Sequence, residues 1–101
     1  MDSVVKNKWF SLSLVEQMLN IGNEVKRAVR FDASRDKRDP FLDKAITYTD
    51  LTMEDPKNSR VIPELAISRE LLEDYKNGTL CACSKEQMTK YYGNFRFLHK
   101  N

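Results

Sequence analysis

Residues 13–28 carry the strongest structural signal in the chain, that of an amphipathic helix. Ser13 and Glu16 have the spacing of a capping box, in which each side chain bonds the backbone amide of the other. Apolar residues then recur three or four positions apart, which places them on one helical face. They are Leu14, Met18, Ile21, Val25 and Ala28. We therefore expect a helix over residues 14–31. Gly22 lies beside this stripe, and we expect it to mark a close approach of a second helix.

Prolines bound two further helices. Asp39 followed by Pro40 predicts a helix start, because Asp is a preferred N-cap and Pro is tolerated at the first helical position. Pro56 disfavours helical geometry just before it, so this second helix is expected over residues 40–54. Pro63 opens a third helix, expected over residues 63–76, which ends before Asn77 and Gly78.

A second capping box, Ser84 with Gln87, precedes aromatic residues at helical spacing and predicts a fourth helix over residues 85–98. Short polar links between four amphipathic helices favour antiparallel neighbours. With 101 residues and three Gly and three Pro, the chain suits one domain and lacks the turn signals of an all-β fold. The fold class expected is an all-α, antiparallel up-and-down four-helix bundle over residues 9–101, with residues 1–8 frayed or disordered.

The chain has no apolar stretch near the roughly 20 residues that span a bilayer, and its first residues lack the apolar region of a signal peptide. We therefore expect a soluble, cytoplasmic protein with no membrane partner. The net charge of +2 is too small to imply a nucleic-acid partner by composition.

Four segments of the sequence can be compared with known proteins: SLVEQ from Ser13, NIGNEVKRA from Asn20, DLTMEDPKNSR from Asp50 and RELLEDY from Arg69. With these segments the chain resembles a family of small, uncharacterised bacterial all-helical proteins, over roughly residues 9–78. The resemblance implies a helical cytosolic protein and no mechanism. The charged connection before Asp39, the Ile62-Pro63 pair and the segment 81–83 depart from the family pattern.

Few residues suit metal or redox chemistry. Cys81, Cys83 and His99 make three candidate ligands, whereas a structural zinc site needs four. No Glu is followed by His at the Glu-x-x-His spacing of di-iron bundles. Phosphate-binding glycine loops and a nucleophile elbow are also absent from the sequence. We therefore expect no metal and no cofactor.

Basic residues gather at the end of the first helix and in the following connection. They could follow a phosphate backbone, but Asp32, Asp36 and Asp39 interrupt them and no aromatic residue lies in the loop to stack on bases. The alternative is a solvated helix end, where cations also suit the helix dipole. The candidate basic surface is Lys26, Arg27, Arg30, Arg35, Lys37 and Arg38.

Arg69 is the other candidate, because its helical phase places a charge among Ile62, Leu65 and Leu72. A buried cation needs a carboxylate partner. Glu24 on the first helix is the first choice and Asp50 on the second helix is the second choice, with Glu73 as a local partner at i+4. An Arg69 that extends its head to solvent, a structural ion pair and a functional polar pocket all remain open.

Three functions follow from these patterns. The leading hypothesis is a non-enzymatic interaction or accessory bundle that binds another protein or a second copy of itself. The alternatives are a nucleic-acid-contacting protein that uses the basic end of the first helix, and an enzyme built on a polar cluster of Glu24, Asp50 and Arg69. The sequence assigns no catalytic residue.

Overall fold

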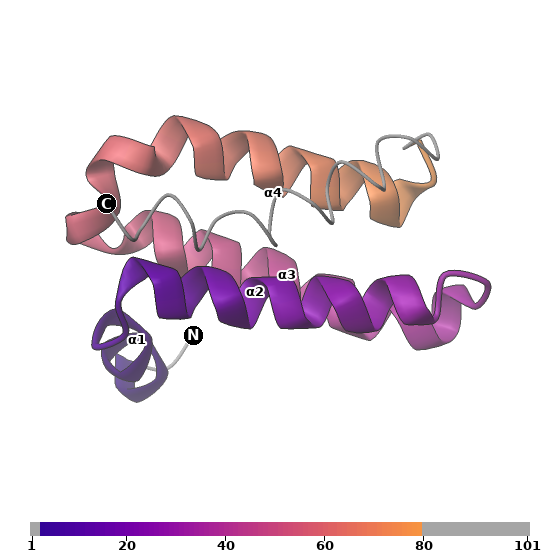
Figure 1. Ribbon diagram of the computed structural model, residues 1–101, viewed down its shortest axis with the longest axis horizontal. Helices are drawn as coiled ribbons and strands as arrows, with labels where there is room; N and C mark the ends of the chain where they lie inside the picture. Colours follow the sequence, from indigo (N-terminus) through magenta and orange to yellow (C-terminus); the bar gives the residue numbers. More distant parts are fainter. Residues whose placement is uncertain (1–2, 80–101) are drawn as a thin grey trace.

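The computed structural model describes residues 3–79, and all regular structure in this part of the chain is helical (Figure 1). The expected all-α class is confirmed. The helix expected over residues 85–98, together with Cys81, Cys83 and His99, lies outside the described residues. The elements are α1 (Ser3–Phe10), α2 (Leu14–Arg30), α3 (Arg35–Glu54), the 3-10 helix η1 (Pro56–Val61) and α4 (Ile62–Asn77).

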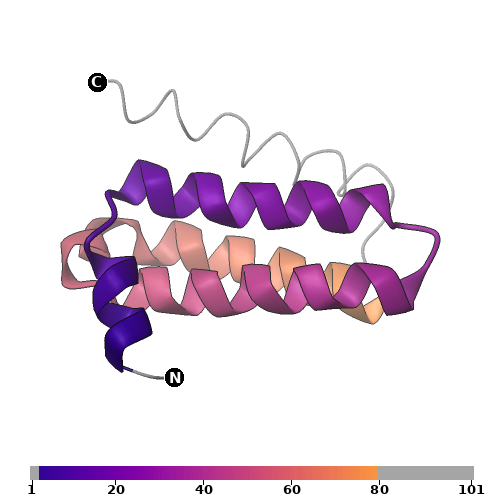
Figure 2. The ribbon, with the colours of Figure 1, turned by 90° about the horizontal axis from the view of Figure 1, so that it is seen from below.

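Helix α3 is the central element. It packs against α1, α2 and α4, whereas α2 and α4 have little contact with each other. Helices α2 and α4 run in the same direction and α3 runs in the opposite one, as expected for an up-and-down order (Figures 1 and 2). The buried apolar core joins these helices through Trp9, Met18, Ile21, Val25, Ala28, Leu42, Ala45, Leu51, Leu65, Leu72 and Tyr75.

Helix α2 agrees with the sequence pattern. Both bonds of the capping box are present at 3.2 Å, one from the Glu16 amide to Ser13 Oγ and one from the Ser13 amide to Glu16 Oε1. The helix ends at Arg30, one residue before the expected end. Gly22 is buried on this helix, and the close helix approach expected there stays a prediction.

Helix α3 begins at Arg35, five residues before the expected start at Pro40. Asp39 is therefore not an N-cap; its carboxylate pairs with Arg38 Nη2 at 2.9 Å. The extra turn is held by contacts with α4, because Arg35 and Arg38 both donate to the backbone carbonyl of Lys76. Pro40 lies inside the helix and lacks an amide hydrogen, so these contacts offset one missing helical hydrogen bond.

Residues expected to be frayed form part of α1. Trp9 anchors this helix on α3, with its ring stacked on Tyr48 at 4.6 Å between centroids and its Nε1 donating to Thr52 Oγ1 at 3.1 Å. This segment has no cap and no apolar period in its sequence, and the buried Trp9 provides its main apolar attachment. Order was expected only from residue 9 onward.

Helix α4 spans Ile62–Asn77, within one residue of expectation at each end. Gly78 follows in the left-handed conformation, with φ of 79°, and its amide bonds the Tyr75 carbonyl. This is the stop that the Asn77-Gly78 pair predicts, because glycine adopts positive φ without a Cβ clash. One of the short polar links expected between helices, the one between α3 and α4, forms η1.

Candidate functional site

Arg69 joins α4 to α3 through two carboxylates. Its Nε donates to Asp50 Oδ1 at 2.5 Å and its Nη1 donates to Glu73 Oε1 at 2.8 Å. The hydrogen bond to Asp50 raises the pKa of the Arg69 guanidinium above its ordinary value. The Arg69 side chain is 33% exposed and Asp50 is 46% exposed, so water screens both ions.

The predicted cluster is therefore only half formed. Asp50, the second choice, pairs with Arg69, whereas Glu24, the first choice, lies on α2 and accepts from Arg27 at 2.8 Å. Glu24 was the wrong partner because α2 and α4 have little contact, a fact that helical phase alone does not reveal. Of the alternatives left open for Arg69, the structure has a partly exposed ion pair, because the side chain is 33% exposed. Ile62, expected on the inner face of the helix, is 39% exposed.

A groove between α3 and α4 adjoins this cluster, with a volume of about 390 Å³. Lys76 crosses it to Asp43, with 2.6 Å between Nζ and Oδ1, and this hydrogen bond raises the pKa of Lys76. A protonated lysine is not a nucleophile at neutral pH. The two carboxylates of the groove, Asp43 and Glu73, already pair with Lys76 and Arg69. The arrangement thus ties two helices together. The groove is lined by Asp43, Ile46, Thr47, Glu73, Lys76 and Asn77.

The candidate basic surface is divided by the fold. Arg35 and Arg38 direct their guanidinium groups to the Lys76 carbonyl, at 2.8 and 3.1 Å. Two cations at the carboxyl end of α4 complement its dipole, which is a structural role. The members that are exposed and that have at most one ion pair within residues 3–79 are Lys26, Arg27, Arg30 and Lys37.

Arg38 is also part of a packed cluster. It is buried, and its guanidinium carbon lies 4.7 Å from the centroid of the Tyr75 ring. The Tyr75 hydroxyl donates to Asp32. Burial and this hydrogen bond raise the pKa of Tyr75 well above its ordinary value, so the phenol stays protonated. The cluster closes the end of the bundle where the α2–α3 connection meets α4.

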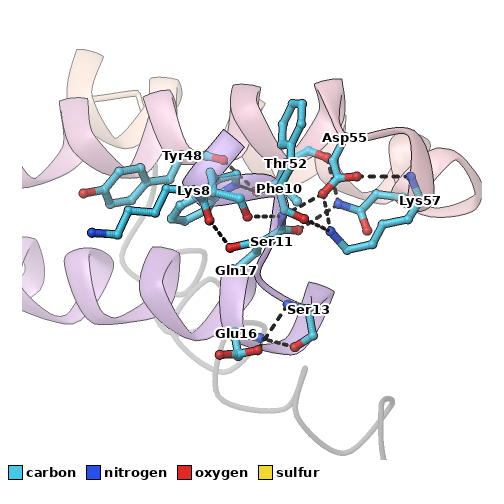
Figure 3. A network of polar contacts seen from close by, with 12 residues as sticks. Lys8, Phe10, Ser11, Ser13, Glu16, Gln17, Tyr48, Thr52, Asp55 and Lys57 are labelled. Atoms are coloured by element: carbon cyan, nitrogen blue, oxygen red, sulfur yellow. Dashed lines mark hydrogen bonds and ion pairs between the residues drawn. The ribbon is translucent and has the colours of Figure 1, made fainter. Parts of the chain in front are cut away.

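A buried polar network at the opposite end was not predicted from the sequence (Figure 3). Gln17 is fully buried, and its Nε2 donates to the Trp9 carbonyl at 3.0 Å and to Asp55 Oδ2 at 2.9 Å. Asn58 donates to Gln17 Oε1 at 2.8 Å. The network connects α1, α2 and η1. Its signal in the sequence was a polar Gln17 beside the apolar stripe of α2.

Asp55 is the charged member of this network. Its burial by itself would raise the pKa, but hydrogen bonds from Lys57 and Gln17 outweigh that effect and lower the pKa below 3.8. Lys57 also donates to the Phe10 carbonyl at 3.0 Å, which ties the end of α1 to η1 (Figure 3). Among the described residues these side chains bond mainly to one another, although the buried Asn58 Oδ1 accepts no hydrogen bond there. The network therefore has a structural role.

The outer side of α4 exposes apolar residues near its amino end. Ile67 is 61% exposed and Ile62 is 39% exposed, while Pro63 and Ala66 are also exposed. Positions 63, 67 and 71 are four apart and therefore form one row on the helix surface. We call this set, Ile62, Pro63, Ala66, Ile67 and Leu71, the α4 patch.

Carboxylates border the α4 patch. The ion pairs of α4 use Arg69, Glu73 and Lys76. Glu64, Glu70 and Asp74 are left without a cation among the described residues. An apolar stripe beside unpaired acids is a surface that a basic amphipathic helix complements. Sequence reasoning missed it, because it assigned Ile62 to the inner face and left Ile67 out.

Comparison with protein-family models, curated proteins and solved structures gives no match for this chain. The family resemblance noted above therefore stays a prediction. Within residues 3–79, no three side chains of His, Cys, Asp or Glu are grouped as metal ligands. No helix in the same range is both long enough and apolar enough to cross a membrane.

Proposed function

We propose that this protein is a non-enzymatic interaction module that binds an amphipathic helix of a partner protein with the α4 patch. The observation that carries the proposal is Ile67, a large aliphatic side chain that is 61% exposed in the middle of the patch. Single exposed apolar residues are common, but four exposed apolar positions on two successive turns form a continuous surface. Burying such a surface against a helix removes apolar area from water.

The charges around the α4 patch specify the partner. Glu64, Glu70 and Asp74 would attract lysine or arginine at the border of a docked helix and would repel an acidic one. The enzyme hypothesis receives less support, because Asp50 and Glu73 are engaged by Arg69 and Glu24 lies elsewhere. The nucleic-acid hypothesis is weakened by the structural use of Arg35 and Arg38. The proposal includes the cytoplasmic location expected from the sequence.

The test uses a fluorescent synthetic peptide whose helix carries leucine on one face and lysine on the other. Fluorescence anisotropy should show binding to the wild-type protein and a loss of binding with Ile67→Asp. Glu70→Lys should weaken binding through charge repulsion. Lys44→Glu, an exposed substitution on α3 away from the patch, is the matched control and should bind at least as well as the wild type. Equal binding by Ile67→Asp and the wild type would refute the α4 patch as the binding surface.

A further inference from the structure

A second unpartnered helix surface lies on α2. Leu19 is 38% exposed on this helix, and Asn23, Lys26 and Arg30 follow it at helical spacing on the exposed side. Leu19, Asn23, Lys26 and Arg30 form what we call the α2 face. Lys26 and Arg30 have no ion-pair partner among the described residues. This surface is apolar at its amino end and basic at its carboxyl end.

The α4 patch has the complementary order along its own helix. Its apolar residues surround Ile67, and two of the acids that border it, Glu70 and Asp74, follow toward the carboxyl end, while Glu64 lies on the amino side. Lys26 comes seven residues after Leu19, and Asp74 comes seven residues after Ile67. At 1.5 Å per residue, both intervals are about 10.5 Å along the helix axis. When two parallel helices pack with Leu19 against Ile67, Lys26 therefore lies opposite Asp74.

The direction of packing follows from the same spacing. An antiparallel pair with Leu19 against Ile67 would carry Lys26 beyond the amino end of α4, which begins at Ile62, and Asp74 beyond the amino end of α2. Only the parallel arrangement sets the opposite charges of Lys26 and Asp74 against each other. Because α2 and α4 already run in the same direction within one chain, a second copy can make this contact while keeping nearly the same orientation (Figure 1).

We propose that the partner of the α4 patch is the α2 face of a second copy of this chain. The proposal rests on the proposed function, since it names the partner for the same surface. The two surfaces differ, so the contact is heterologous: each copy uses its α4 patch toward one neighbour and its α2 face toward the other. Such contacts generate a ring or an open stack of copies. Two single-helix faces bury a small area, so the association is weak and depends on concentration and salt.

Sedimentation equilibrium over a micromolar to millimolar concentration series tests the association. The wild-type protein should exceed the mass of one chain as concentration rises, and added salt should reduce this effect. Leu19→Asp and Ile67→Asp should each remain single chains. When these two variants are mixed, one intact α2 face meets one intact α4 patch, so pairs should form and nothing larger.

The mixing result distinguishes the proposed contact from a symmetric one. If two α4 patches met each other, Leu19→Asp would still associate alone, and the mixture would gain nothing; this outcome overturns the proposal. A wild-type protein that stays a single chain at every concentration also overturns it. If that protein still binds the leucine and lysine peptide through Ile67, the proposed function stands without the self-association.

Charge reversal provides a test that leaves the apolar residues intact. Lys26→Glu should weaken association at least about tenfold, because it opposes Asp74 with a like charge. Adding Asp74→Lys to the same chain should restore it. Lys44→Glu is the control and should leave association unchanged. Circular dichroism verifies that each variant is folded. Failure of the double reversal to restore association would show that Lys26 and Asp74 do not meet.

Discussion

Asp50 and Asp55 show how strongly surroundings decide what a carboxylate does. The Asp50 side chain is 46% exposed and pairs with an arginine that is itself in contact with water. The Asp55 side chain is 5% exposed and binds Lys57 and Gln17 inside the fold. Removing the Asp50 carboxylate and removing the Asp55 carboxylate should therefore lower the free energy of unfolding by different amounts. The first loses a screened attraction, and the second leaves buried partners unsatisfied.

We predict that Arg69→Ala lowers the free energy of unfolding by about 1 kcal/mol, because both of its ion pairs are partly exposed. A double-mutant cycle with Asp50→Ala, measured by urea denaturation, should give a coupling energy of about 0.5 kcal/mol. Costs of about 3 to 5 kcal/mol for each single variant would instead indicate a buried pair.

Gln17→Ala should be far more costly. It removes the amide that Asp55 and Asn58 both use, and each would lose a partner in a buried position. We expect a loss of about 2 to 4 kcal/mol in urea denaturation, since each buried unsatisfied group costs about 1 to 3 kcal/mol. Asn23→Ala, an exposed substitution on the same helix, is the control and should change stability by less than about 0.5 kcal/mol.

Asp55 also gives the fold a defined pH dependence. Its folded pKa lies below the ordinary value of 3.8, so the unfolded chain binds the proton more readily. The stabilising contribution is complete above pH 3.8 and is lost as pH falls through the lower, folded pKa. The stability advantage of the wild type over Asp55→Asn should thus be constant near neutral pH and shrink at more acidic pH. An advantage that grew on acidification would contradict this assignment.

At the level of single elements, the sequence correctly predicted those helix ends that are determined by residues close by in the chain. The capping box of Ser13 and the stop at Gly78 act within a few residues, and both are present. The start of α3 was missed because its cause is distant: Arg35 bonds the Lys76 carbonyl, 41 positions later. The partner of Arg69 was misassigned for the same reason, since helical phase gives a direction but not the neighbouring helix.

The stop after α4 yields a prediction of its own. Gly78→Ala should lower stability by about 1 kcal/mol, because an L side chain is strained at a φ of 79°. The added Cβ would lie 3.6 Å from Arg35 Nη2, an ordinary contact, so the cost comes from the backbone. Asn77→Ala at the exposed preceding position is the control. Thermal unfolding followed by circular dichroism measures both, and an unchanged Gly78→Ala would exclude the strain.

For the whole molecule, the central position of α3 matters most. Leu42 is fully buried on α3, and its truncation to Ala should lower the free energy of unfolding by about 2 to 5 kcal/mol.

Because α2 and α4 are joined mainly through α3, unfolding of the wild-type protein should be a single cooperative step. Urea curves from circular dichroism and from the fluorescence of Trp9, the one tryptophan of the chain, should coincide. Separated curves would show that α1 unfolds independently. Ile67→Ala, at an exposed site, is the control for Leu42→Ala and should change the free energy of unfolding little.

The long-range contacts of α1 determine when this helix can dock during synthesis of the chain. Trp9 binds Thr52, and the Phe10 carbonyl binds Lys57, so the partners of α1 follow it by 43 and 47 positions. Synthesis proceeds from the amino end, and long-range contacts close later than local ones. Helix α1 therefore leaves the ribosome before its partners and can dock only after α3 has emerged. Until the carboxyl half of α3 emerges, the indole of Trp9 lacks both Tyr48 and Thr52, the side chains that cover it in the fold.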